Sequence, residues 1–345
     1  MHRHIAYALL AAALFGASTP LAKLLLADMQ PQLLGGLLYL GSGLGLALVR
    51  LLRDGGWKPV GLASGEWPWL LGAIAFGGVL GPVALFWGLA STPAASASLL
   101  LNLEAVLTAV LAWLCFRENA DRRVVAGMAA IVAGSVALSW PRAGSPLAVS
   151  NGVFAVALAC LCWAVDNNLT RKVSASDALF IASTKGLVAG CVNTGLALAW
   201  GATLPSMTTT GAAMALGLLG YGVSLVLFVL ALRSLGTART GAYFSVAPFA
   251  GAALALALGE VATPLFWLAA GLMALGVWLH LTERHAHEHE HDAMGHAHAH
   301  SHDAHHQHSH AFAWDPDKPH SHWHEHAPLR HHHAHFPDIH HRHRH

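Results

Sequence analysis

Two acidic residues stand inside long apolar stretches of this chain, where carboxylates are rare. Glu104 lies near the middle of the stretch 94–115, with Thr108 one helical turn further on, and Asp166 lies in the stretch 148–170. An ionised carboxylate at the centre of a membrane helix costs about 3 kcal/mol, so it must face protein or water. We predict that both carboxylates contact a solute or carry a coupling proton. For Glu104, a structural hydrogen bond to a neighbouring helix is the alternative.

Asp166 has polar neighbours at helical spacing. Trp163, Asp166 and Asn167 lie at positions i, i+3 and i+4, which gives one polar helix face with an aromatic ring at its deeper end. Such a face suits a polar or cationic solute, because the face of an indole ring attracts cations. An ion pair between Asp166 and Arg171 near the end of the stretch is the alternative.

Two lysines also lie within apolar stretches. Lys23 is about one turn from Asp28, and Lys185 is about two turns from Asp177. We interpret both mainly as residues whose ammonium groups extend toward the membrane surface. Pairing with a buried carboxylate is the alternative, and on that basis both are included among the candidate site residues. The chain has no nucleophile with an adjacent base, no phosphate-binding loop and no HExxH motif, so we predict that it is not an enzyme.

The end of the chain has a different chemistry. Only three of the 27 histidines come before residue 282, which leaves 24 in the tail. Neutral imidazoles at His-x-His spacing suit Zn²⁺, Ni²⁺, Co²⁺ or Cu²⁺. The tail lacks the spacing of a closed tetrahedral site, so we predict several exchangeable sites and no required cofactor; a tail that binds metal only incidentally is the alternative. The predicted ligands are His287, His289, His291, His296, His298, His300, His302, His320, His322, His324 and His326.

The composition places the rest of the chain in a lipid bilayer. The 345 residues are 55% hydrophobic and 11% charged, with a mean hydropathy of +0.49, which excludes an ordinary soluble protein. A membrane helix needs roughly 20 apolar residues. Stretches of about that length predict ten helices, at 5–27, 33–52, 68–90, 94–115, 124–140, 148–170, 178–200, 211–232, 238–258 and 264–282. A signal peptide is the alternative for the first stretch, but the apolar residues continue past any cleavage point.

The distribution of Lys and Arg in the short loops predicts the orientation. With the N-terminus in the cytoplasm, that side receives Arg3, Arg50, Arg53, Lys58, Arg117, Arg122, Arg123, Arg171, Lys172, Arg233, Arg239 and Arg284. The other side receives only Arg142. By the positive-inside rule, both termini are therefore cytoplasmic, in what we expect to be a bacterial inner membrane. Five helices in each half also make the second half inverted relative to the first.

The chain repeats its own pattern. Phe86–Glu118 returns 142 residues later as Phe228–Glu260, although only four of the 33 aligned positions are identical. The predicted fold is an all-α polytopic membrane protein of two inverted five-helix repeats, at 1–140 and 141–283. A disordered tail follows at 284–345.

These features carry a family resemblance. The helix ends LNLEAV…FRE and VAPF…LGE, with the aromatic and small polar residues around Trp163, make residues 5–282 resemble the EamA-type family of the drug/metabolite transporter superfamily. The family's fourth helix usually has Pro after the Glu; here Ala105 stands there, while Pro248 keeps the proline in the second half. The resemblance implies a solute site between the halves, lined by helices 1, 3, 4, 6, 8 and 9.

Together these observations predict a secondary transporter, an exporter that moves a small solute by alternating access. Two alternatives remain: an exporter of Zn, Ni, Co or Cu ions that the tail collects, and a membrane-anchored metal-binding or sensing protein. The expected partners are the lipid bilayer and a small-molecule or ion substrate, with no nucleic acid. A homodimer is also considered.

Overall fold

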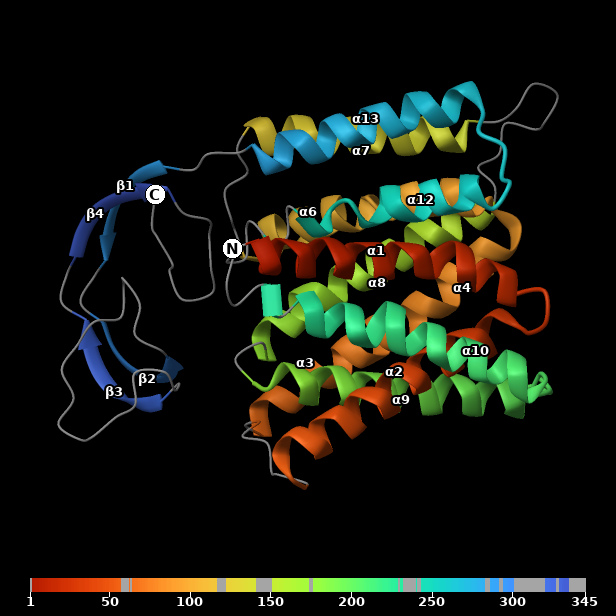
Figure 1. Ribbon diagram of the computed structural model, residues 1–345. Helices are drawn as coiled ribbons and strands as arrows, with labels where there is room; N and C mark the ends of the chain where they lie inside the picture. The colour runs from red at the N-terminus through yellow and green to blue at the C-terminus, as the bar shows by residue number, and fades with distance from the viewer. Residues whose placement is uncertain are drawn as a thin grey trace. The chain divides into compact units, whose positions relative to one another are not determined.

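The computed structural model describes residues 2–56, 62, 64–116, 122–140, 151–173, 176–228, 230–231, 240, 243–282, 286–291, 294–300, 320–326 and 329–334. The chain forms two compact units, Met1–Glu283 and Arg284–His345. The first unit consists of helices, and the second contains short strands (Figure 1).

Eight helices of the first unit are long and apolar enough to cross a membrane, and two shorter apolar helices, Ala247–Ala257 and Pro264–Leu279, follow them in the described part of the chain. Each of the ten apolar stretches therefore contains helix. The α-helices are α1 (His2–Leu25), α2 (Pro31–Asp54), α3 (Trp67–Ala73), α4 (Gly81–Ser91), α5 (Ala94–Leu100), α6 (Leu103–Phe116), α7 (Arg122–Ser139), α8 (Asn151–Thr170), α9 (Ala178–Ala199), α10 (Met207–Gly217), α12 (Ala247–Ala257) and α13 (Pro264–Leu281). Two 3-10 turns, η1 (Ser64–Glu66) and η3 (Arg171–Val173), flank α3 and α8.

A π-helical segment, η2 (Ile74–Leu80), lies between α3 and α4 within one continuous membrane span. Pro82 gives a local reason for it. An α-helix would pair the N–H of residue 82 with the carbonyl of Gly78, and a π-helix would pair it with that of Gly77, but proline has no N–H. Both carbonyls are therefore left for side-chain donors.

The irregular backbone of the first half recurs in the second. A second π segment, η4 (Leu218–Val223), follows α10, and it begins 144 residues after η2 (218 − 74). A turn at 101–102 separates α5 from α6, and a turn at 245–246 precedes α12, again 144 residues later (245 − 101). Single-turn π segments are rare, so two at one spacing are a strong sign of a repeated unit.

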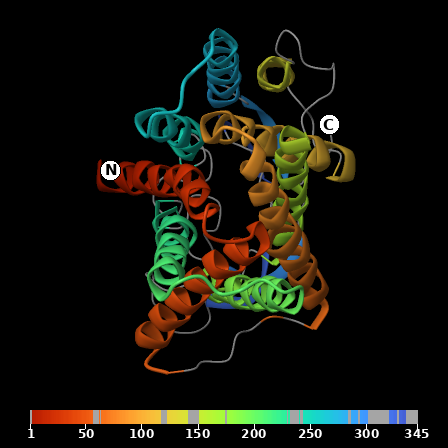
Figure 2. The same cartoon turned by 90° about the vertical axis from the view of Figure 1, so that its right-hand side faces the viewer.

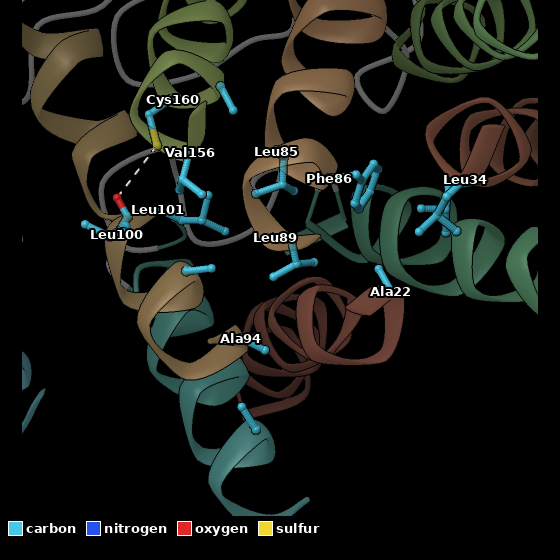
Figure 3. Packing of buried hydrophobic residues seen from close by; sticks show 14 of the residues in the cluster. Ala22, Leu34, Leu85, Phe86, Leu89, Ala94, Leu100, Leu101, Val156 and Cys160 are labelled. Atoms are coloured by element: carbon cyan, nitrogen blue, oxygen red, sulfur yellow. Dashed lines mark hydrogen bonds between the residues drawn. The ribbon is translucent and has the colours of Figure 1, made fainter. Parts of the chain in front are cut away.

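The helices pack in pairs that combine segments distant in sequence. α2 crosses α9, α4 packs on α8, and α1 packs on α12. α7 and α13 lie side by side along one edge of the unit, as both Figure 1 and Figure 2 show. The main apolar cluster is centred on α4, where Leu85, Phe86 and Leu89 are at most 1% exposed. Figure 3 shows these side chains with Leu34 of α2 and Val156 of α8.

Small residues let α2 and α9 approach closely. A Cβ on Gly186 would come within 2.6 Å of the Cα of Gly43, and a Cβ on Gly190 would come within 2.9 Å of the Cα of Leu40. Real Cβ atoms do not tolerate such contacts. Gly186 and Gly190 are therefore helix-packing residues.

The second unit has short paired strands within the segment that we expected to be disordered. β1 (Ala286–His291) pairs antiparallel with β4 (Leu329–Ala334), and β2 (Met294–His300) pairs antiparallel with β3 (His320–His326). Alternating His-x-His matches the two-residue period of a β-strand. Composition alone favoured disorder because it does not take this alternation into account. The remaining tail residues, His302 included, and all tail side chains lie outside the described part of the structure.

Candidate functional site

Glu104 lies in the first turn of α6, directly after the turn that separates α5 from α6. Its backbone N–H donates to the carbonyl of Leu101 at 3.0 Å. The amide of Asn167 on α8 donates to Glu104 Oε1 at 2.9 Å and to the hydroxyl of Thr108 at 3.3 Å. The positive end of the α6 dipole favours a carboxylate at this position. The structure thus joins three of the predicted site residues into one polar contact between α6 and α8.

Asp166 and Lys185 form an ion pair between α8 and α9. The Lys185 ammonium lies 2.6 Å from Oδ1 and 2.7 Å from Oδ2 of Asp166, which is 7% exposed. The hydroxyl of Thr170 donates to Oδ1 at 2.8 Å. Lys185 is therefore bound to a buried carboxylate and does not extend to the membrane surface, so the snorkelling interpretation is wrong for it. Asp166 is not available as a free cation site, because its charge is matched.

The carbonyls left free by Pro82 in η2 accept bonds from three other helices. The indole N–H of Trp163 and the hydroxyl of Tyr39 both donate to the Gly77 carbonyl, at 3.0 and 2.9 Å. The amide of Asn193 donates to the Gly78 carbonyl at 3.0 Å. The hydrogen bonds to the irregular backbone therefore fix the orientation of the Trp163 and Tyr39 rings.

Gly77 also borders the ion pair. A Cβ on Gly77 would come within 2.6 Å of the Asp166 Cβ and closer still to its carboxylate. Any side chain at position 77 would displace Asp166. Because glycine has none, η2, α8 and α9 can meet at this point.

Lys23 belongs to a different cluster, at the far end of α1. Its ammonium donates to the Thr92 carbonyl at 2.5 Å and lies 3.6 Å from Glu260 Oε1. The two oxygens of Glu260 accept the backbone N–H groups of Ala94 and Ala95 at 2.7 and 2.8 Å, so this carboxylate caps α5. Lys23 thus pairs with a carboxylate from the other half of the chain and not with nearby Asp28.

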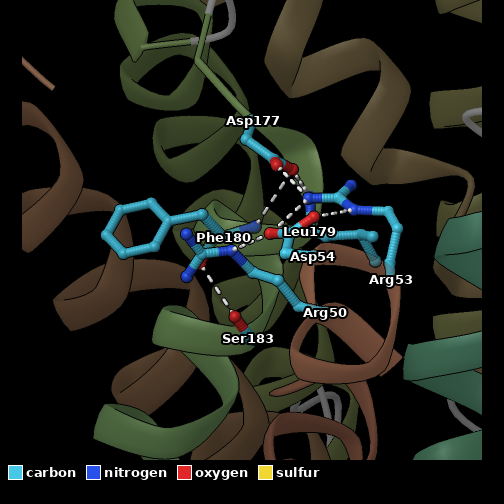
Figure 4. Close-up of polar contacts among 7 residues, drawn as sticks. All are labelled: Arg50, Arg53, Asp54, Asp177, Leu179, Phe180 and Ser183. Carbon is cyan, nitrogen blue, oxygen red and sulfur yellow. Dashed lines mark hydrogen bonds and ion pairs between the residues drawn. The ribbon is translucent and has the colours of Figure 1, made fainter. Parts of the chain in front are cut away.

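A third charged cluster joins α2 to the start of α9 (Figure 4). Arg53 lies 2.5 Å from Asp177 and 2.6 Å from Asp54, and Asp177 caps α9 by accepting the N–H of Leu179 at 2.8 Å. Partial burial acts to raise the pKa of Asp177. The bonds from Arg53 and the α9 backbone outweigh it and hold that pKa below its usual value.

A chain of aromatic rings starts beside the polar network. Tyr39 contacts Tyr221 of η4 at 5.5 Å between ring centroids, Tyr221 contacts Phe15 of α1 at 5.8 Å, and Phe15 contacts Phe244 at 5.5 Å. The rings come from both halves of the chain. The ring contacts therefore join α1, α2 and η4.

Sequence reasoning missed Tyr39, Asn193, Gly77 and the capping role of Glu260. For η2 there was a signal, since Gly-Gly followed four residues later by Pro breaks the helical bonding pattern. For Tyr39 and Asn193 there was none, because their partners lie on other helices. Among the residues that the structure describes, no three His, Cys, Asp or Glu side chains come together as a metal site.

Comparisons with known proteins agree with this architecture. An uncharacterized transporter of Methanothermobacter thermautotrophicus is 28% identical over 257 residues, covering 70% of this chain and 75% of that protein. A crystal structure matches with a TM-score of 0.59 at 20% identity, covering 79% of this chain and 95% of its own, which shows a shared fold. The sequence model described as the EamA-like transporter family matches residues 2–140 and again 150–282. This chain is a membrane protein that belongs to the EamA-like transporter family.

Proposed function

We propose that this protein is a secondary transporter that exports a small solute by alternating access between two inverted halves. The observation that carries the proposal is the polar network inside the membrane segments, in which Asn167 of α8 binds Glu104 of α6 and the buried Asp166 of α8 pairs with Lys185 of α9. Ionisable side chains inside membrane segments are costly and mark solute or proton pathways. Helices that only anchored a tail would not need them, so the network favours transport over a membrane-anchored sensor.

The repeated backbone supports the two-halves part of the proposal. The counterparts of α1, η2 and α6 in the second half are α8, η4 and α12. When each element is exchanged for its counterpart, the contact of α1 with α12 becomes that of α8 with α6, and the contact of α1 with η4 becomes that of α8 with η2. The pairs α2 with α9 and α7 with α13 map onto themselves. Such exchange symmetry is what an inverted-repeat transporter uses to alternate between two states.

The Lys23–Glu260 cluster supports a state closed at one end. With a cytoplasmic N-terminus, α1 ends and α5 begins at the outer side. There Glu260 links Lys23 of α1 to the first turn of α5. We assign this cluster as the outer closure, which must separate when the protein opens outward.

Growth and export of solutes test the proposal. A strain lacking this protein is challenged with amino acids, toxic amines and metal salts, and the full chain is expected to restore resistance to one class. Glu104→Gln is expected to insert normally and to lose pH-dependent export, because a neutral amide cannot carry the proton. Asp28→Asn, in the exposed turn after α1, is the matched control and should export normally. Unchanged export by the Gln variant would reduce Glu104 to a packing residue.

Export of transition-metal ions is the second candidate function, and the tail register favours it. The β2–β3 ladder places His296 opposite His324, His298 opposite His322 and His300 opposite His320. Imidazole must be neutral to bind a metal, so tail binding of Ni²⁺ should weaken as the pH falls from 7.5 to 5.5. Metal-specific loss of resistance after removal of residues 285–345 would favour metal as cargo. Unchanged resistance to an organic solute would assign the tail a separate role.

A further inference from the structure

The β2–β3 ladder of the tail gathers its histidines on one face. The backbone of these strands is described, so each residue is placed by its register and by the alternation of faces along a strand. Residues that are directly opposite one another in an antiparallel ladder share a face. Three histidine pairs therefore lie on the same face: His296 with His324, His298 with His322 and His300 with His320. The other face holds no histidine; its positions are Gly295, Ala297, Ala299, Ser321, Trp323 and Glu325.

The β1–β4 ladder repeats this arrangement. His287 is paired with His333, and His289 with His331, and both pairs again share one face. A shift of the register by one residue would move the histidines of one strand to the opposite face. The register of each ladder is therefore one that brings the histidine-bearing faces of its two strands together.

Two neighbouring pairs have the dimensions of a metal site. Opposite residues of an antiparallel ladder have Cβ atoms about 5 Å apart, and residues two apart on one strand are about 7 Å apart. An ion above the centre of such a rectangle lies within reach of four imidazoles. Four nitrogen ligands complete the tetrahedral shell that Zn²⁺ takes in structural sites.

The ladders have few apolar residues to stabilise them. Each sheet consists of two strands, and isolated two-stranded sheets are only marginally stable in water. The large apolar residues of the four strands are Met294, Trp323 and Leu329. Small units that lack a hydrophobic core commonly depend on a metal ion, and the free energy of metal binding then contributes to folding.

We propose that each ladder binds one divalent transition-metal ion of the Zn²⁺ class through two neighbouring histidine pairs, and that this ion holds the two strands together. In β1–β4 the four histidines are His287, His289, His331 and His333. In β2–β3 they are the middle pair, His298 and His322, with one of the outer pairs. This inference rests on the metal binding proposed for the tail and deepens it, because it assigns two defined sites where composition indicated several exchangeable ones. It does not require that metal be the exported solute.

Zinc titration of the purified, untagged full chain tests the assignment. A chromophoric chelator competes for the ion, so that only tight sites are counted. The wild type should bind roughly two tight Zn²⁺ ions per chain, one for each ladder. The middle-pair variant, His298→Ala with His322→Ala, should lose one of them, because the outer pairs are four residues apart and cannot share an ion.

A control variant separates register from composition. His305→Ala with His306→Ala removes the same number of histidines from the segment between β2 and β3 and should keep both tight ions. Equal losses in the two variants would mean that the number of histidines, and not their register, determines binding. That result would overturn the proposal.

Spin labels on the opposite face show whether the ion holds the strands. Ala299 and Ser321 are paired in β2–β3 on the face without histidines. Labels on cysteines at these two positions, in a chain without the four native cysteines, should broaden each other's spectra in Zn²⁺ and separate when EDTA removes the ion. In the middle-pair variant they should stay apart in Zn²⁺. Labels that stay close in EDTA, or that never approach in Zn²⁺, would overturn the proposal.

The site and the export of metal fail in different ways. If the middle-pair variant loses its tight ion but confers unchanged resistance to metal salts, the site is correctly assigned and metal export is wrong. If that variant binds Zn²⁺ as the wild type does, the site is wrong, whichever solute the helical unit exports.

Discussion

At the scale of single residues, the polar groups inside the membrane segments bind partners on neighbouring helices: Asp166 pairs with Lys185, and Asn167 binds Glu104. Helical spacing predicted one polar face of α8 with Trp163, Asp166 and Asn167; in the structure Asp166 contacts α9, whereas Asn167 contacts α6. It could not show that Lys185 is the partner of Asp166, because this pairing depends on how α8 and α9 pack. Local spacing instead suggested Arg171. A neighbour in sequence is visible in the chain, whereas a neighbour across a helix interface is not.

The Asp166–Lys185 pair leads to a charge-rescue prediction. Removing one member of a buried ion pair costs about 3–5 kcal/mol because it leaves the other charge unpaired, while replacing both is far less costly. Asp166→Asn and Lys185→Met should each lower the melting temperature of the purified protein in detergent. The double variant should recover most of the loss. Additive losses in the double variant would show that the two charges do not depend on one another.

At the scale of elements, the close crossing of α2 and α9 rests on glycine. Gly186→Ala should weaken this interface, since the new methyl group would overlap the backbone of Gly43. We expect a lower melting temperature and less folded protein in the membrane. Gly195→Ala is a matched control on the same helix, because a Cβ there has nothing within 4 Å. Equal effects of the two variants would mean that helix propensity, and not packing, determines the stability of both.

Asp177 at the start of α9 should make stability depend on pH. Its pKa is lowered in the folded protein, so its contribution is present above the pKa of the unfolded chain and is lost as the pH falls through the lower, folded value. Asp177→Ala should lose the helix cap, at a cost of about 1 kcal/mol. Asp177→Asn should keep the cap while losing the charge. Melting curves between pH 3 and 7 should show a smaller acid-dependent loss of stability in both variants than in the wild type.

The positions of the helices were predictable because length and hydropathy determine a membrane span. Hydropathy could not reveal the irregular segments η2 and η4, since it is the same for α- and π-helical residues; only the Gly-Gly and Pro spacing gave a signal, and only for η2. The gapless alignment of the two halves also gave a spacing of 142 residues, whereas the backbone features recur at 144. With so few identities, an alignment anchored on aromatic and acidic residues cannot detect a difference of two residues in the spacing between the halves.

At the scale of the whole molecule, the orientation of the chain remains a prediction from its charges. Single cysteines at Ser301 and Ser145, in a background without the four native cysteines, should report opposite sides of the membrane. A reagent that cannot cross the membrane should label position 145 in intact cells and position 301 only after lysis. Labelling of position 301 from outside would contradict the cytoplasmic tail and the assignment of the Lys23–Glu260 cluster to the outer side.

Flux through the purified protein in liposomes tests the central claim most directly. The full chain, the chain ending at Glu283 and the full-length Glu104→Gln variant are reconstituted at equal density, and uptake of the solute identified by growth is followed after a pH jump. The full chain and the shortened chain should both transport, because both matched family segments end by residue 282. The Gln variant should not respond to pH. Transport that required the tail and ignored the charge of Glu104 would contradict a transporter built from the two helical halves.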